Sequence, residues 1–381
     1  MMRVPLLAFL ALATFGCATV NPDPALTASP QTIRPAIVRV DFTRDGLGVV
    51  SAAGDAGVAG RAVSIDDPVR VASISKLVVA LAAMRLVDAG QLNLDRDVST
   101  YLGWTARNPA FPDMPVTLRQ LLSHRAGLTD GIDYIVPLDG DLSLVLANPK
   151  AWDAVHAPGS YFQYANINSP LIAATLEGAT GERFDRLMAR LILEPLKLDA
   201  CYNWSAGCSD GRRAQAVTLL RPNGDLARDA AISGRDPCPV LAASDGSCDV
   251  EKNYRLARNG SAFSPQGGLR ISAHDLARVG QVLLNEGRPL LSPKAFAEMI
   301  GPVWQFDGSN GADEKGYFKV YGLGIHWLDD NKGGRWIGHV GEAYSVRAGF
   351  WVNQKAGKGF VRYATMVDEF AAVGHCFETC P

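Results

Sequence analysis

The sequence predicts an α+β fold in which one antiparallel sheet, flanked by helices, carries an inserted and mainly helical domain. Three observations lead to this prediction. Runs of strand type stand near both ends of the chain, helical patterns fill its middle, and one early helix is apolar almost all round and must be buried. A sheet built from both ends leaves a cleft beside the insert, which is where we expect a substrate pocket.

The first residues have the chemistry of a targeting segment. Arg3 precedes an apolar stretch shorter than the roughly 20 residues needed to span a bilayer, so residues 1–17 predict a signal peptide. Cys17 resembles the cysteine that is lipidated in bacterial lipoproteins, whereas Ala-Leu-Ala at 11–13 offers an ordinary cleavage site. Residues 18–34 predict a tether. We expect an exported protein, periplasmic or anchored to a bacterial envelope membrane only through a lipid at Cys17.

Strands should open the folded domain and a helix should follow them. Three β-type runs separated by turn residues predict an antiparallel meander over 36–42, 46–52 and 58–65. Apolar residues at helical spacing then predict a helix from Ser73 to Ala89, which should end at Gly90.

Helices joined by polar loops should fill the middle of the chain, and strands should close it. The expected helices are Leu118–His124, capped by Thr117 and Gln120, then Asn168–Ala179, Arg183–Ile192 and, after a loop-rich region at 200–262, Leu276–Asn285. Strands are expected over 321–327, 335–339, 345–352 and 359–366. We therefore assign 35–95 and 265–381 to the sheet domain and 96–264 to the helical insert, together forming one domain.

Composition and cysteine usage limit the class of protein. The formal net charge is -2 and no long run of like charges occurs, so a small-molecule or peptide substrate fits better than nucleic acid. Of the seven cysteines, six remain when Cys17 is set aside. Such an even set predicts disulfides in an exported chain, although their connectivity cannot be read from sequence alone. The close pairs are Cys201 with Cys208, Cys238 with Cys248, and Cys376 with Cys380. A zinc site is the weaker alternative because no CxxC occurs, and we expect no metal and no cofactor.

The segment Ser73-Ile-Ser-Lys76 could carry chemistry at the start of the buried helix. A spacing of three residues puts Ser73 and Lys76 on one helix face, and the helix start offers backbone N–H groups to a developing oxyanion. A partly buried lysine amine can be neutral near pH 7 and act as the base for a serine hydroxyl. The alternative is a serine that caps the helix, followed by a solvated lysine.

Further blocks accompany this segment in order along the chain. They are Arg70-Val-Ala-Ser-Ile-Ser-Lys76, Gly90-Gln-Leu-Asn-Leu-Asp95, Thr117 to Leu128, Pro158-Gly159, Tyr164-Ala-Asn166, Gln266-Gly-Gly-Leu269, Tyr321-Gly-Leu-Gly324 and His339-Val-Gly341. In this combination the sequence resembles the serine β-lactamase superfamily. It is most similar to the branch of class C β-lactamases, D-alanyl-D-alanine carboxypeptidases, D-aminopeptidases and related esterases. The resemblance implies a β-lactamase/transpeptidase-like fold.

The resemblance also implies a role for individual residues. Ser73 would be the nucleophile and Lys76 the base that takes its proton. Tyr164 would be the second proton carrier, which relays a proton to the leaving group, and Asn166 would hold Lys76 and the substrate amide. A phenol beside a positive charge can carry a proton in this way.

The block His339-Val-Gly341 stands where β-lactamases carry Lys-Thr-Gly. The resemblance implies an oxyanion hole made of the N–H groups of Ser73 and Glu342, with Gly341 letting the backbone approach a bound acyl group. Because histidine is neutral near pH 7 unless perturbed, the site loses a fixed cation that would bind a carboxylate. His339 resembles the peptidase and esterase relatives more than true β-lactamases.

These residues predict a serine hydrolase that acts through a Ser73 acyl-enzyme in the cell envelope. Its substrates should be amides or esters, either D-amino-acid peptides or small acyl esters. Two alternatives stay open: a non-catalytic, acyl-trapping penicillin-binding or sensor lipoprotein, and a true class C-like β-lactamase. The walls of the substrate pocket would come from the loops around 129–163 and 200–262. Because these loops lie largely outside the motifs, the motifs do not identify the substrate.

Overall fold

The computed structural model describes residues 32–206, 208–229, 238–313, 316–330 and 332–368. From Ile33 onward the chain forms one compact unit. The predicted signal peptide with Cys17, nearly all of the predicted tether, and the pair Cys376 and Cys380 lie outside the described residues. Within the described ranges, no helix combines the length and the apolar character that crossing a bilayer demands.

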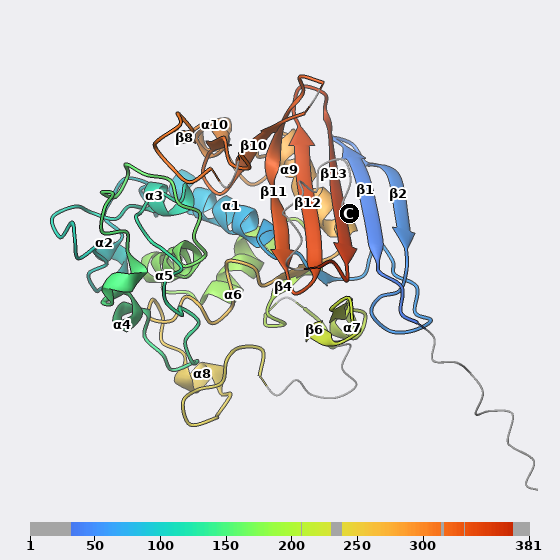
Figure 1. Ribbon diagram of the computed structural model, residues 1–381, viewed down its shortest axis with the longest axis horizontal. Coiled ribbons are helices and arrows are strands. Elements are labelled where there is room, and N and C mark those ends of the chain that lie inside the picture. Colours follow the sequence, from blue (N-terminus) through green and yellow to red (C-terminus); the bar gives the residue numbers. More distant parts are fainter. Residues whose placement is uncertain (1–31, 207, 230–237, 314–315, 331, 369–381) are drawn as a thin grey trace, which may run out of the picture. The chain divides into compact units, whose positions relative to one another are not determined.

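Among the described residues, eight antiparallel strands form the central sheet, which confirms the predicted α+β class (Figure 1). Their spatial order is β2-β1-β13-β12-β11-β10-β9-β8. The first and last strands are neighbours, since Ile37 lies opposite Ala364 and Thr43 opposite Lys358. The strands are β1 Ile37–Thr43, β2 Leu47–Ala53, β8 Trp304–Gln305, β9 Val320–Tyr321, β10 His326–Asp329, β11 Arg335–Ala343, β12 Val346–Asn353 and β13 Lys358–Thr365.

The run at residues 58–65 is not a strand, so the prediction of a three-stranded local meander was wrong. The segment forms turns and a bridge between Asp55 and Ala62. Gly57 and Gly60 both have φ of +75°, a left-handed conformation that ends an extended run. A third strand of the meander would lie beside β2, but β2 is the edge strand of the sheet as described, and the second neighbour of β1 is β13, which is far away in the sequence.

Two helices pack on the sheet. Helix α1 (Ile74–Asp88) contacts β11 and β12, and α9 (Ala273–Leu284) contacts β1, β12 and β13. The close approach of α9 depends on Gly280, where a Cβ would lie 2.1 Å from the ring of Phe42. Helix α10 (Pro293–Ile300), which the sequence analysis missed, packs against α1. Helix α1 is buried over most of its length, as its apolar sequence predicts.

The middle of the chain is helical, but its elements are short. Helix α3 begins at the predicted capping box, in which Thr117 and Gln120 each accept a hydrogen bond from the other's backbone N–H. The single helix predicted over 183–192 divides into α6 and a π-helical turn. The elements are α2 Ser99–Leu102, α3 Leu118–Leu122, α4 Leu142–Leu146, the 3-10 turn Pro149–Ala151, α5 Asn168–Thr180, α6 Phe184–Met188, the π turn Ala189–Leu193, α7 Asp210–Ala214 and α8 Val250–Asn253.

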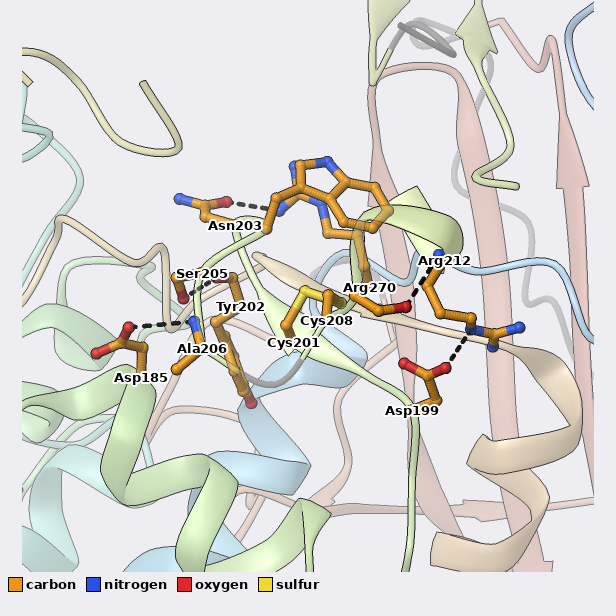
Figure 2. Close-up of a disulfide and its surroundings, with 12 residues drawn as sticks. Asp185, Asp199, Cys201, Tyr202, Asn203, Ser205, Ala206, Cys208, Arg212 and Arg270 are labelled. Carbon is orange, nitrogen blue, oxygen red and sulfur yellow. Dashed lines mark hydrogen bonds and ion pairs between the residues drawn. A yellow bond between two sulfur atoms is a disulfide. The ribbon is translucent and has the colours of Figure 1, made fainter. Parts of the chain in front are cut away.

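A smaller sheet joins the start of α1 to the first pair of cysteines. Its strands are β3 (Val69–Arg70), β7 (Leu269–Ile271) and β4 (Cys201–Tyr202), in the order β3-β7-β4. Cys201 is bonded to Cys208, and Figure 2 shows this disulfide beside Tyr202 and Arg270. The corner before α1 is thus braced by a cross-linked strand.

The loop-rich region predicted at 200–262 also holds a second disulfide and a hairpin. Cys238 is bonded to Cys248, so each of the two described disulfides joins one of the close pairs named from the sequence. Strands β5 (Leu219–Leu220) and β6 (Leu226–Arg228) form the hairpin. Such short elements have too few residues to show a periodic pattern in the sequence.

Candidate active site

Ser73 lies at the corner where β3 leads into α1. The corner is held by a hydrogen bond from the N–H of Val71 to the carbonyl of Leu269 (3.1 Å), and Ala72 has φ of 47°. Ser73 is partly exposed, and its side chain makes no capping hydrogen bond. Its Oγ instead lies 2.9 Å from Nζ of Lys76. The alternative of a capping serine followed by a solvated lysine is therefore wrong.

Lys76 is buried among three hydrogen-bond acceptors. It is 5% exposed, and its Nζ contacts Ser73 Oγ, Asn166 Oδ1 at 2.8 Å and the carbonyl oxygen of Gln266 at 2.9 Å. Burial lowers the pKa of Lys76 from 10.5 to about 7. A neutral amine has two N–H donors and one lone pair. When Lys76 donates to Asn166 and Gln266, its lone pair is left for the proton of the Ser73 hydroxyl.

Asn166 is held by an aspartate that the sequence analysis missed. Asp130 Oδ2 accepts hydrogen bonds from the backbone N–H (2.9 Å) and from Nδ2 (3.0 Å) of Asn166, and Oδ1 accepts from the N–H of Ile167. Because Nδ2 is engaged with Asp130, Oδ1 of Asn166 is turned toward Lys76. The charge of Asp130 also raises the pKa of Lys76, against the larger effect of burial. An aspartate before a glycine has the signature of a turn residue, so no local signal marked it.

Tyr164 contacts both Ser73 and Lys76. Its side chain shares a hydrogen bond with Ser73, and Nζ of Lys76 lies 5.0 Å from the centroid of its ring. Phe318 stacks on the ring with the centroids 5.1 Å apart. Burial raises the pKa of the Tyr164 hydroxyl above its usual value of 10.0, so the phenol is protonated at neutral pH. It can relay a proton there, but it is not the first base.

The loop that carries Tyr164 is positioned by His124, at the end of α3. The ring of His124 lies 4.4 Å from that of Tyr164, centroid to centroid, and its Nδ1 accepts a hydrogen bond from the N–H of Ala165 (3.2 Å). Burial lowers the pKa of His124 well below 6.5, so the ring is neutral and its proton is on Nε2. His124 thus acts as a fixed polar support.

His339 is fully buried and uncharged. Its Nδ1 lies 2.6 Å from the carbonyl oxygen of Val340, and its Nε2 lies 3.1 Å from the hydroxyl of Tyr321. Nδ1 therefore donates and Nε2 accepts, which is the pattern of a neutral imidazole. Burial and the nearby Lys76 lower the pKa of His339 from 6.5 to about 3. This position supplies no cation at neutral pH.

Strand β11 presents an open edge beside Ser73. Strand β10 pairs with β11 only as far as Gly338, and in the described part of the chain no strand covers that edge farther on. A Cβ on Gly341 would lie 2.1 Å from the carbonyl oxygen of Val71, so the strand touches the corner before Ser73. The Glu342 carboxylate accepts a hydrogen bond from Arg347 on β12 (2.7 Å), and Glu342 itself lies past Gly338, on the part of the β11 edge that no described strand pairs with.

The structure therefore brings the predicted site residues together around the start of α1. They are Ser73, Lys76, Tyr164, Asn166, His339, Gly341 and Glu342. A serine hydroxyl, an amine of lowered pKa, a protonated phenol and an open strand edge in one place can support acyl transfer.

Comparison with known protein sequences gives matches over most of the chain. A family model described as Beta-lactamase matches residues 38–373. The D-alanyl-D-alanine-carboxypeptidase/endopeptidase AmpH of Escherichia coli K12 is 25% identical over 315 residues, which cover 80% of this chain and 69% of that protein. Esterase EstB of Burkholderia gladioli is 33% identical over 162 residues, which cover 38% of this chain and 40% of the esterase. The chain thus matches less than half the length of EstB.

Solved structures share the fold. A penicillin-binding protein homologue from Pyrococcus abyssi aligns with a TM-score of 0.64 and 18% identity, over 88% of this chain and 70% of that chain. A D-amino acid amidase from Ochrobactrum anthropi SV3 aligns with a TM-score of 0.62 and 18% identity, over 87% of each chain. At such identities the likeness concerns the fold alone, and it confirms the β-lactamase/transpeptidase-like architecture.

Proposed function

The chain belongs to the β-lactamase family of serine hydrolases, and from this premise we propose that Ser73 attacks the carbonyl carbon of an amide or ester and forms an acyl-enzyme. One observation carries the proposal. Ser73 Oγ lies 2.9 Å from the amine of Lys76, a buried group with a pKa of about 7. A nucleophile and a base at this distance and this pKa are matched for proton transfer at neutral pH.

Acylation then follows from the positions of the groups. Neutral Lys76 takes the proton of Ser73 as Oγ bonds to the carbonyl carbon, and the N–H groups of Ser73 and Glu342 stabilise the oxyanion. Tyr164 gives its proton to the leaving amine or alcohol and receives the proton held by Lys76. Water then attacks the acyl-enzyme, loses a proton to the same groups, and releases the acid with Ser73 restored.

The substrate class that we propose is a D-amino-acid peptide or a small acyl ester. Relatives with the same fold are named as an esterase, a D-alanyl-D-alanine carboxypeptidase and a D-amino acid amidase. The neutral His339 argues against a true β-lactamase, because a β-lactam carboxylate would find no cation at this position.

We also propose that the enzyme is exported and works in a bacterial envelope. Cys201–Cys208 and Cys238–Cys248 are disulfides, and such bonds persist in oxidising compartments. Lipidation of Cys17 would tether the enzyme to a membrane, whereas cleavage after residues 11–13 would release it into the periplasm.

Time-resolved intact-mass spectrometry of the mature domain tests the proposal. Wild type and Ser73→Ala are mixed with a nitrophenyl ester and, separately, with a penicillin, while turnover is followed by absorbance. We expect wild type alone to gain the acyl mass and then to lose it, with the ester cleared faster than the penicillin.

The other outcomes distinguish the alternatives. A lasting adduct would favour an acyl-trapping sensor, and rapid clearance of the penicillin would favour a β-lactamase. Neither adduct nor turnover with wild type, or equal turnover by Ser73→Ala, would remove Ser73 as the nucleophile.

A further inference from the structure

The open edge of β11 gives the cleft two chemically different ends. Near its start, the ring of His339 lies 6.1 Å from that of Tyr164, the group proposed to protonate the leaving group. Farther along, Gly341 touches the corner before Ser73, and the strand then reaches Tyr344 in the turn to β12. In the proposed mechanism the leaving group lies toward Tyr164, so the acyl chain must extend the other way, toward Tyr344.

The side chains of two arginines lie over the ring of Tyr344. Cζ of Arg70 lies 4.7 Å from the ring centroid, and Cζ of Arg228 lies 5.5 Å from it. Tyr344 and Ser345 have φ of 54° and 58°, so a tight turn fixes the ring at the end of the strand. Arg228 belongs to β6, which Figure 1 shows below the lower end of the sheet. Two cations on one ring attract an anion to this end of the cleft.

The positive charge is not balanced among the described residues. Arg270 is paired with Asp229 at 2.7 Å, and the charge of Asp229 also raises the pKa of Arg70, but in the described ranges neither Arg70 nor Arg228 makes an ion pair at contact distance. Arg70 is buried, donates to Ser264 Oγ at 3.2 Å, and has no described partner for Nε and Nη1. Burial and the charge of Arg270 lower the pKa of Arg70 to about 9, still far enough above 7 for a full charge.

Arg228 is the member of this group that a ligand can reach. It is exposed, and within the described part of the chain its side chain makes no hydrogen bond and no ion pair. The nearest acidic side chain on β11, Glu342, is paired with Arg347. Asp130 and Asp133 are the acidic groups near Tyr134, whose pKa is raised by burial and then by these groups together with Tyr164 and Tyr344, and Asp130 is engaged with the backbone N–H and Nδ2 of Asn166. The acyl end of the cleft is therefore its positive end.

We propose that Tyr344 and Arg228 form an acyl-group subsite for a short chain that ends in a carboxylate. The preferred substrates would be esters or amides of a dicarboxylic acid, or peptides with an acidic group on the acyl side. The reach fits such a chain, because the step of two residues from Glu342 to Tyr344 spans roughly 7 Å of extended backbone. This inference rests on the proposed function and specifies its substrate class.

A matched pair of esters tests the subsite. The pair is the mono-4-nitrophenyl ester of adipic acid, with a free carboxylate, and the same compound with that carboxylate methylated. We expect wild type to favour the acid over the methyl ester by about tenfold or more in kcat/KM, and this preference to fall as salt screens the charge. Arg228→Gln should lose most of the preference, because its kcat/KM on the acid falls toward its own kcat/KM on the methyl ester.

Two further variants sharpen the result. Arg228→Lys keeps the charge and should retain part of the preference. Arg221→Gln removes the same charge from the same hairpin, and it should behave as wild type, because the Arg221 side chain donates to the carbonyl of Leu226 within the hairpin. The proposed subsite would be overturned if wild type and Arg228→Gln had equal preference for the acid, or if wild type had no preference. In either case, turnover of the methyl ester would still support the proposed hydrolase function. Turnover of neither ester would overturn both.

Discussion

At the scale of single residues, the proposed role of Lys76 predicts how the reaction depends on pH. The proposed base is the neutral amine, and burial has lowered its pKa to about 7. We expect kcat/KM to rise through pH 7 and to fall about tenfold per unit at lower pH, where the amine is protonated. The plateau should continue into mildly alkaline pH, because the raised pKa of Tyr164 keeps its proton in place.

A substitution of Asp130 tests the role of Lys76 more directly through the same pH profile. Its negative charge raises the pKa of Lys76, so Asp130→Asn should move the acid limb of the profile to lower pH in addition to lowering kcat. If Asp130→Asn merely disturbed the loop around residue 130, the rate would fall at every pH and the acid limb of the profile would stay at the same pH. A limb that stays at the wild-type pH in Asp130→Asn would contradict Lys76 as the base.

The residues of the site differ in how far the sequence could predict them. Ser73 and Lys76 are three positions apart on one helix, so their contact is local and the spacing predicts it. Asp130 acts only after a loop has folded against Asn166, and Gln266 acts through a backbone carbonyl that every residue has. Neither signal exists in the linear sequence.

At the scale of elements, the contact between β11 and the corner before α1 sets the distance from Ser73 to the open strand edge. Gly341→Ala would place a methyl group 2.1 Å from the carbonyl oxygen of Val71, so the strand must shift. A shift of about 1 Å in a catalytic group can cost roughly a hundredfold in rate, and we expect a loss of that order in kcat with the fold retained. Circular dichroism and steady-state kinetics together measure this.

Gly48→Ala on β2 is the control for the same sheet. A Cβ there would lie 3.5 Å from the carbonyl oxygen of Asp41, an ordinary contact, so activity should stay near the wild-type level. If Gly341→Ala were as active as Gly48→Ala, the edge of β11 would not take part in catalysis.

The elements also show where the sequence was informative and where it was not. The capping box of α3 and the apolar pattern of α1 identified these helices, because both signals are local. The run at 58–65 has strand composition but also two left-handed glycines, and among the described strands β2 has no neighbour on the side where a meander would put a third strand, whereas β1 pairs with the distant β13. Pairing between distant strands depends on the whole fold, and a local pattern does not contain it.

At the scale of the whole molecule, the two disulfides should act alike on stability and differently on activity. Each closes a short loop, with sequence separations of 7 and 10 residues, so loss of either should lower the free energy of unfolding by about 2–3 kcal/mol. Denaturant unfolding and kcat/KM should be measured for two double variants, Cys201→Ser with Cys208→Ser, and Cys238→Ser with Cys248→Ser.

We expect only the first double variant to lose activity beyond its loss of stability. The hydroxyl of Tyr202, next to Cys201, donates to the carbonyl of Ser75 (3.2 Å), and the N–H of Asn203 donates to the carbonyl of Gly268 (2.9 Å). Both bonds brace the backbone around Lys76 and Gln266. Equal activity in the two double variants, at equal folded fraction, would show that this brace does not affect the base.

The pairing of β1 with β13 means that the sheet cannot close before the last strand has been synthesised. On a ribosome, the segment with Ser73 emerges early, but β11 and β13 follow more than 260 residues later. Long-range pairing of this kind is slow to form and cannot be anticipated by a partial chain. A nascent or truncated chain therefore contains Ser73 without the strand edge that would complete its site, and we expect hydrolytic activity only once translation of the domain is finished.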